Sequence, residues 1–254
     1  MAELKPGAGK THRAYVWVYR SACQPLVVYD YRGSRAGEHA REFLRGWSGT
    51  LVVDDFSGYK ALFAGGAIRE AGCWAHARCK FFEAYKLTGS ALAAQALERI
   101  GEIYRIEQDL RDLDPDERLR RRRQDAQPRL DALHAWLIEQ RPKLAKADAT
   151  ARAIDDALGR WTALGVFADD HRVPIDNNAA ERAVRPIALG RKNWLFVGSR
   201  QAGERAAARM TLIESAKLCG LDPWAYLKDV FTKLPTWPHS RLSELLPHHW
   251  TPPS

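Results

Sequence analysis

Short apolar runs near the start of the chain predict β-structure followed by a helix. Residues 14–19 and 25–29 are rich in β-branched and aromatic side chains, and a turn-length gap separates them. This arrangement predicts a β-hairpin. Over residues 37–47 the apolar positions recur every three to four residues, and the pattern stops near Gly49. That spacing predicts an amphipathic helix after the hairpin.

A third predicted strand ends in two acidic residues. Residues 51–53 form a short, wholly apolar run, as expected of a strand in the centre of a sheet. Asp54 and Asp55 lie at its C-terminal end. Because side chains alternate between the two faces of a strand, only one of these carboxylates can face a given site.

From about residue 87 the pattern becomes that of an all-helical block. Apolar residues recur at helical spacing over 92–110, 118–140 and 145–164, and an Asp-Pro pair breaks the pattern between the first two. Three amphipathic helices are therefore predicted. The block 87–170 is nearly neutral, and we interpret it as an insertion between two halves of an α/β core.

After this block the chain again mixes extended and helical patterns. Residues 193–197 predict an extended pair, and residues 204–218 predict a helix. Asp222 and Pro223 are suited to be the N-cap and first-turn proline of a last helix. The tail, 235–254, is rich in Pro and His and is predicted to pack as an irregular extension.

Four parts are thus predicted: the first half of the core (1–86), the helical insertion (87–170), the second half of the core (171–234) and the C-terminal tail (235–254).

Composition places the chain among folded proteins. Its 254 residues are 46% hydrophobic and 28% charged, as in an ordinary globular protein rather than a disordered one. No apolar run approaches a membrane span in length, and the N-terminus lacks the apolar segment of a signal peptide. The four cysteines, without a secretory signal, suggest a reducing compartment. A cytoplasmic protein is expected.

The net charge of +8 lies on the two flanks of the chain. Residues 1–86 carry 13 basic and 8 acidic side chains, residues 87–170 carry 14 and 16, and residues 171–254 carry 12 and 7. If the flanks fold together, they form one basic surface suited to a polyanion. The alternative is a solvated surface that keeps the protein soluble.

The segment that begins at Asp176 is the most informative candidate for chemistry. Glu181 opens a predicted helix, and seven basic residues lie between Arg182 and Arg209 against the single acid Glu204. A carboxylate can hold a hard divalent cation, and clustered arginines can hold phosphates. The alternative is a capping box, in which Asn178 and Glu181 satisfy a helix N-terminus. The residues expected to hold phosphates are chiefly Arg182, Arg185, Arg191 and Lys192.

Three other motifs were weighed. Residues 9–11 lack the earlier glycine and the preceding strand that a phosphate loop needs. Cys73, His76 and Cys79 are too few for a structural zinc site, so a buried Cys73 and a His76 that supports a neighbouring site are favoured. The arginine run 120–123 has acidic neighbours, which favours a solvated helix face over a nucleic-acid contact.

Asp54 and Glu181 together suggest polynucleotidyl transfer. Such enzymes bring acidic side chains together on a ribonuclease-H-like sheet. Two metal ions held there activate a water or a 3′-hydroxyl and stabilise the leaving oxygen.

These residues occur in motifs of one family. The chain closely resembles transposases of the insertion-sequence 66 family, in the order Leu51-x-x-Asp54-x-Phe56-x-Gly58-Tyr59, Gly72-Cys73-Trp74-Ala75-His76-x-Arg78, Asp176-Asn177-Asn178-x-x-Glu181-Arg182 and Gly190-Arg191-Lys192-Asn193-Trp194-x-Phe196-x-Gly198-Ser199. The likeness continues through 212–217, 221–227 and 246–250. It therefore covers nearly the whole chain.

The resemblance implies a DDE-type catalytic domain: a ribonuclease-H-like α/β core with a mixed sheet, an all-helical insertion and a helical C-terminal region. Asp54 matches the second catalytic acid and Glu181 the third, both as Mg²⁺ ligands for two ions. Asp55 falls where relatives often have glycine, which favours Asp54. The site is expected to be supported by Cys73, His76, Arg78 and Asn177.

The chain departs from the family pattern at its start. The family's first core strand, with the first catalytic aspartate, would precede residues 4–11, and the chain begins at Met1. We therefore expect a transposase catalytic-domain fragment that would cut and rejoin DNA at element ends but is inactive as written. The alternative is a non-catalytic DNA-binding remnant that modulates an intact transposase. The expected partners are element-end and target DNA, with copies of the chain assembling on that DNA.

Overall fold

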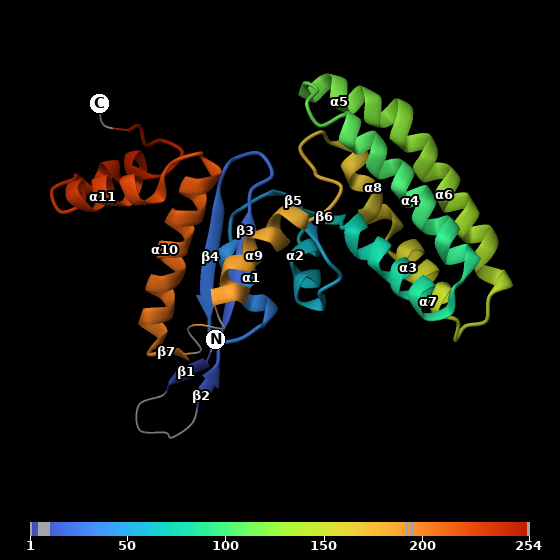
Figure 1. Ribbon diagram of the computed structural model, residues 1–254, viewed down its shortest axis with the longest axis horizontal. Helices are drawn as coiled ribbons and strands as arrows, with labels where there is room; N and C mark the ends of the chain where they lie inside the picture. Colours follow the sequence, from blue (N-terminus) through green and yellow to red (C-terminus); the bar gives the residue numbers. More distant parts are fainter. Residues whose placement is uncertain (1, 5–10, 191–192, 194–195, 253–254) are drawn as a thin grey trace. The chain divides into compact units, whose positions relative to one another are not determined.

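The computed structural model describes residues 2–4, 11–190, 193 and 196–252 (Figure 1). The chain divides into two compact units. One, the terminal unit, consists of Met1–His39 and Ala179–Ser254; the other, the central unit, is Ala40–Asn178. Both contain helices and short strands, so the predicted α/β class is confirmed. The predicted division into core, insertion and tail stays a prediction.

The terminal unit is built on the predicted hairpin. Strands β3 (Tyr15–Arg20) and β4 (Val27–Arg32) are antiparallel, which confirms the prediction. Helix α10 (Arg200–Leu218) packs along β4. Gly203 permits this close approach, because a Cβ there would lie 2.5 Å from the ring of Tyr31. The helix starts four residues before the predicted position, at its N-cap Ser199.

Polar side chains of α10 bind the backbone of the hairpin. The hydroxyl of Ser215 accepts from Val27 N at 3.2 Å and donates to Val27 O at 3.0 Å. Tyr29 N donates to Thr211 Oγ1 at 2.9 Å. These bonds satisfy backbone groups of β4 that no described strand pairs with, since hairpin and helix together bury them.

Further elements complete the terminal unit. Strand β1 (Ala2–Leu4) pairs with β2 (Thr11–Arg13) and, in parallel, with β7 (Phe196–Val197). Part of the predicted extended pair 193–197 is therefore a strand, and residues 194–195 lie outside the described residues. Helix α9 (Asn178–Gly190) accepts a hydrogen bond from the Tyr29 hydroxyl at Ala183 O, 2.6 Å.

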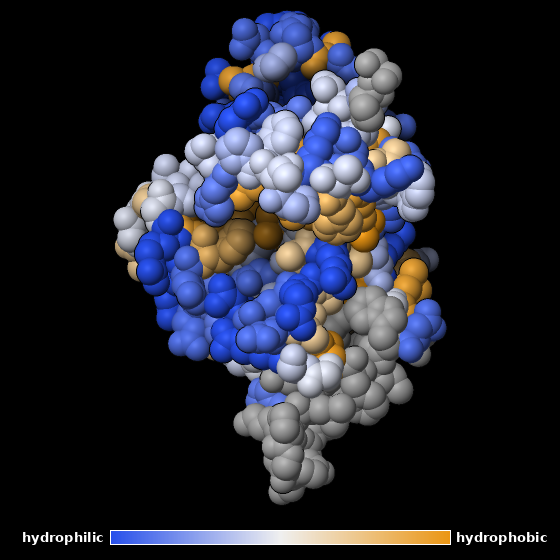
Figure 2. Space-filling model, turned by 90° about the vertical axis from the view of Figure 1, so that its left-hand side faces the viewer, coloured by the Kyte–Doolittle hydropathy of each residue, from blue (hydrophilic) through white to orange (hydrophobic). Residues whose placement is uncertain are grey.

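The C-terminal region has its own small core. Helix α11 (Pro223–Lys233) begins after Asp222, whose Oδ1 accepts from Ala225 N at 2.7 Å, as predicted. The tail is more regular than predicted: a 3₁₀ helix forms at His239–Leu245, and Trp250 is buried against Tyr226. Figure 2 shows the left-hand side of Figure 1, where α10 and α11 lie, and on this face apolar patches lie among hydrophilic side chains.

The central unit begins with a pair of parallel strands. Strand β5 (Gly49–Val53) pairs with β6 (Ile68–Gly72), with Val53 opposite Gly72. The predicted strand 51–53 is confirmed, and β6 is an additional strand. Helix α1 (Gly37–Phe43) precedes β5 and is shorter than predicted. The link from β5 to β6 holds a 3₁₀ turn (Ser57–Tyr59) and α2 (Lys60–Phe63).

Helices make up the rest of the central unit. They are α3 (Trp74–Thr88), α4 (Ala91–Asp109), α5 (Pro115–Arg121), a π-helical turn (Arg122–Ala126), α6 (Gln127–Gln140), α7 (Ala149–Gly159) and α8 (Trp161–Asp169). The first predicted helix is confirmed as α4. The second predicted helix is interrupted by the π turn, and the third is divided at Arg160.

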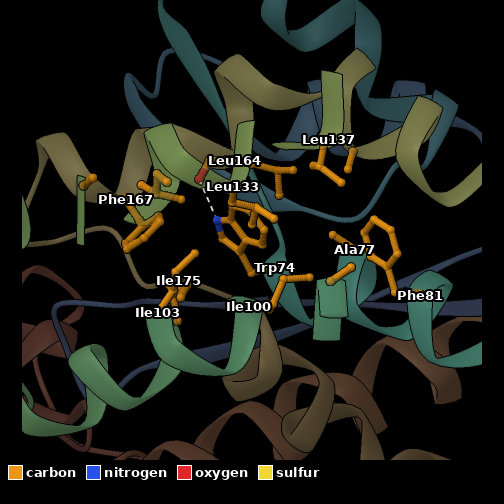
Figure 3. Packing of buried hydrophobic residues seen from close by; sticks show 14 of the residues in the cluster. Trp74, Ala77, Phe81, Ile100, Ile103, Leu133, Leu137, Leu164, Phe167 and Ile175 are labelled. Atoms are coloured by element: carbon orange, nitrogen blue, oxygen red, sulfur yellow. Dashed lines mark hydrogen bonds between the residues drawn. The ribbon is translucent and has the colours of Figure 1, made fainter. Parts of the chain in front are cut away.

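An apolar core joins α3, α4, α6, α7 and α8 to β6 (Figure 3). Trp74 lies at its centre, with its indole nitrogen donating to Leu164 O at 2.8 Å. Gly72 lets α8 approach the strand, since a Cβ there would be 3.0 Å from the Leu164 side chain. The strand end that precedes α3 is therefore held by the helical part of the unit.

The arginine run 120–123 differs from the prediction at one position. Arg120 and Arg121 pair on the helix surface with Glu117 and Asp125, as a solvated face would. Arg122 is buried, only 3% exposed, and its guanidinium binds both carboxylate oxygens of Glu107 at 2.6 and 2.8 Å. The solvated-face interpretation was therefore wrong for Arg122.

Candidate functional site

Asp54 and Cys73 lie at the same end of the parallel strand pair. Val53 is opposite Gly72 in the register of β5 and β6, and Asp54 and Cys73 are the next residues of the two strands. Asp54 is half-buried, and its Oδ1 accepts a hydrogen bond from Phe56 N at 3.3 Å. The backbone turn after β5 thus helps to fix the direction of this carboxylate.

Arg160 binds the same strand end from the junction of α7 and α8. Its Nη2 donates to Glu70 Oε1 at 2.8 Å and lies 3.5 Å from the backbone oxygen of Asp54. Its Nε is 3.7 Å from Asp55 Oδ1. Arg160 therefore places a cation beside Asp55, and the choice of Asp54 as the candidate site residue stays a prediction. Arg160 was not predicted to take part.

Cys73, His76 and Asn177 form a hydrogen-bonded cluster. The Cys73 thiol donates to Asn177 Oδ1 at 3.0 Å and accepts from Asn177 N at 3.5 Å. His76 Nδ1 lies 3.4 Å from the same sulfur. Burial raises the pKa of the Cys73 thiol, so the thiol stays neutral and can donate. The prediction of a buried Cys73 is confirmed.

Asp176 is held by a tyrosine of the helical block and by its own chain. Tyr104 Oη on α4 donates to Asp176 Oδ2 at 2.9 Å. Asn178 donates to Asp176 twice, from its backbone N to Oδ1 at 3.0 Å and from Nδ2 to Oδ2 at 2.7 Å. Burial, followed by the charge of Asp176, raises the pKa of Tyr104 far above its usual value. Tyr104 was predicted only as a residue of an amphipathic helix face.

The remaining candidates that the structure describes are exposed. Glu181 lies in the first turn of α9, with Arg182 next to it and Arg185 one turn further along. Arg78 is exposed on α3, and its charge acts on Tyr104. Arg191 and Lys192 lie outside the described residues.

Asp54 and Glu181 fall in different compact units. Their predicted convergence on one site therefore stays a prediction. Both are carboxylates, which suit Mg²⁺. Within the described ranges, however, no three His, Cys, Asp or Glu residues gather closely enough to hold a metal ion. In the same ranges, no helix is long and apolar enough to span a membrane.

The fold and the site define a mixed α/β protein with acidic side chains at a strand end and at a helix start. The chain belongs to the IS66 family of transposases. The model of the "Transposase IS66 family" matches residues 1–205, and that of the "IS66 C-terminal element" matches residues 211–248. The resemblance found in the sequence motifs is thereby confirmed.

Curated relatives come from Sinorhizobium fredii (strain NBRC 101917 / NGR234). "Uncharacterized protein y4hP" is 36% identical over 89% of this chain and 44% of its own length. "Uncharacterized protein y4jD" is 34% identical over 98% of this chain and 52% of its own length. The chain thus spans about half the length of the curated relatives it matches. No solved structure matches it significantly.

Proposed function

We propose that this chain is part of a transposase and carries the second and third acids of a DDE catalytic domain with a ribonuclease-H-like core. Asp54 is the acid at the strand end, and Glu181 is the acid on the following core helix. The reaction of the whole enzyme is cleavage and strand transfer of DNA at the ends of an insertion sequence. Family membership and the order of the motifs support this proposal.

The observation that carries the proposal is the bond between Cys73 and Asn177. Cys73 adjoins Asp54 across the parallel strand pair, and its thiol donates to Asn177 at 3.0 Å. Asn177 directly precedes α9, and Glu181 follows four residues later. The side chains expected to support the site therefore link β6, the strand paired with that of Asp54, to the residue that precedes α9.

The metal requirement is part of this proposal. Asp54 and Glu181 would hold Mg²⁺ ions, which activate the attacking oxygen and stabilise the leaving oxygen in two-metal catalysis. The described residues form no group of three or more candidate ligands. We therefore assign no catalytic step to the chain by itself. What its own residues do is orient the two carboxylates and bind DNA.

The arginines after Glu181 are proposed to hold phosphates. Arg182 and Arg185 are exposed on α9, and in sequence Arg191 and Lys192 extend the same basic segment. Neutralising one phosphate contact weakens binding to any DNA sequence and lowers the dependence of affinity on salt.

DNA-binding titrations test this function. Fluorescence anisotropy with a labelled duplex, at several salt concentrations, compares Arg185→Ala and Arg191→Ala with the wild type. Each variant should bind more weakly, with a salt slope lower by about one unit. Arg120→Ala is the matched control, because Arg120 is exposed but pairs with Glu117. Unchanged affinity and slope in both variants would remove the phosphate-binding role.

A second function is favoured by the incomplete ligand set. The described residues bring no three candidate metal ligands together, and such an arrangement can bind DNA without cleaving it, and so modulate an intact transposase by competition for its ends. A cytoplasmic location and assembly of copies on DNA stay predictions of the sequence.

A further inference from the structure

Every residue from Ile175 to Asn178 is tied by a hydrogen bond. We call these four residues the α9 start segment. Trp74 N donates to Ile175 O at 3.1 Å, and the Cys73 thiol binds Asn177 as described above. Asp176 receives the Tyr104 hydroxyl and both donors of Asn178. The segment is therefore fixed before the helix that carries Glu181 begins.

Tyr104 is the residue of the helical block that binds the α9 start segment. It lies 72 residues before Asp176, on α4, whose buried face belongs to the core of the central unit. Its ring is partly buried against that core, and its hydroxyl reaches the carboxylate at 2.9 Å. A hydrogen bond to an ionised acceptor is stronger than one between neutral groups. The contact therefore joins a rigid helix to a turn.

Asp176 binds both Tyr104 and Asn178, the first residue of α9, and so connects the two. One carboxylate oxygen accepts from Tyr104 and the other accepts from Asn178 N. A side-chain oxygen that binds the backbone two residues later fixes the start of a helix, as capping residues do. With the tyrosine hydroxyl removed, Asp176 keeps its two bonds from Asn178 but loses its bond to helix α4, so the segment is no longer anchored to that helix.

We infer that Tyr104 is a positioning residue, which acts through Asp176 to fix the start of α9 and thereby the presentation of Glu181. The role given to Glu181 rests on the proposed function. The fixing of the segment by Tyr104 does not, because it rests on contacts within the central unit alone. The helical block is then a support of the candidate site rather than a passive insertion.

Hydrogen exchange of the full chain, followed by mass spectrometry, tests the inference. Tyr104→Phe keeps the packed ring and removes only the hydroxyl. Amides of residues 176–182 should exchange about tenfold faster, which corresponds to a loss of about 1.4 kcal/mol of local protection. Peptides from α6 should keep their wild-type rates. Tyr85→Phe, the same change at a 43% exposed tyrosine of α3, is the matched control.

A double-mutant cycle separates positioning from general loosening. Asp176→Ala should accelerate exchange of the segment by itself, and adding Tyr104→Phe should then change little, because both changes break one bond. Unchanged exchange in Tyr104→Phe, equal acceleration throughout the central unit, or fully multiplicative effects would each overturn the inference. A chain that shows the local effect but does not bind DNA would overturn the proposed function instead.

Discussion

At the residue scale, Arg122 shows how partners distant in sequence decide burial. Sequence alone presents four consecutive arginines with acidic neighbours. The guanidinium of Arg122 binds Glu107 on α4 and the carbonyl oxygens of Phe167, Asp170 and Val173. These partners lie 15 to 51 residues away. Composition and periodicity do not encode such contacts, so the burial of Arg122 could not be predicted.

Replacing Arg122 should therefore destabilise the central unit. Arg122→Met keeps an unbranched apolar stem but removes the cation that pairs with Glu107 and the donor to the carbonyl oxygens of Phe167, Asp170 and Val173. Breaking one side of a buried ion pair costs about 3–5 kcal/mol. Urea denaturation should show a lower midpoint, whereas Arg120→Met, on the exposed face of the same run, should keep the wild-type midpoint. Equal midpoints in the two variants would contradict the structural role of Arg122.

At the element scale, the predictions that succeeded rest on local signals. The hairpin was marked by two β-branched runs, and the last helix by Asp222 and Pro223. Strand β6 was missed because Arg69 and Glu70 interrupt its apolar pattern. Parallel pairing with β5 and cover from α8, both distant in sequence, stabilise it.

The residues of the candidate site were likewise predicted only where sequence motifs mark them. Asp54, Cys73, His76 and Asn177 were found through motifs, and the Cys73–Asn177 contact joins residues 104 positions apart. No local pattern marks Tyr104 or Arg160 as a site residue, because tyrosines and arginines are common in amphipathic helical segments. Only the packing of the helical block onto the strand ends reveals what they bind.

The packing of the tail against α11 should weaken at alkaline pH. The Tyr226 hydroxyl donates to Leu245 O at 2.8 Å. Burial, followed by the nearby Cys219, raises the pKa of Tyr226 from 10.0 to about 12. A raised pKa favours the neutral phenol in the folded state, so this contribution is full below pH 10 and is lost as the pH rises through about 12.

Thermal denaturation across that pH range measures the effect. The melting temperature of the wild type should fall between about pH 10 and 12, and that of Tyr226→Phe should fall less steeply, because phenylalanine does not ionise. Tyr29 shares a pKa of about 12, so some alkaline loss remains in the variant. Parallel curves for the two proteins would show that Tyr226 does not hold the tail.

At the scale of the whole molecule, the proposed function requires the two acids to share one site. Two metal ions in such sites lie about 3.5–4 Å apart, so the carboxyl groups of Asp54 and Glu181 should lie within about 4–8 Å of each other. The family resemblance predicts this convergence. The sequence pattern does not establish it, because the convergence depends on how the two units assemble.

Chemical cross-linking can measure this separation. Asp54→Cys and Glu181→Cys are combined in a chain whose exposed thiols, Cys23 and Cys79, are replaced by serine. A short thiol-specific reagent should then join the two introduced cysteines. The same reagent should not join Glu181→Cys to a cysteine at Leu87, an exposed position on α3. Cysteines that react singly at 54 and 181 but never cross-link would remove the catalytic assignment.

A polypeptide of these 254 residues should bind DNA without cleaving it. Two-metal catalysis needs ligands on both ions, and the described residues bring no three candidate ligands together. A two-metal site without a full set of ligands commonly works several orders of magnitude more slowly, because its groups act as a unit. A supercoiled plasmid incubated with the chain in Mg²⁺ or Mn²⁺ should therefore stay uncut under conditions in which the chain retards an oligonucleotide. Metal-dependent nicking that Asp54→Ala abolishes would show that another acid of this chain completes the site, and the binding-only function would then be wrong.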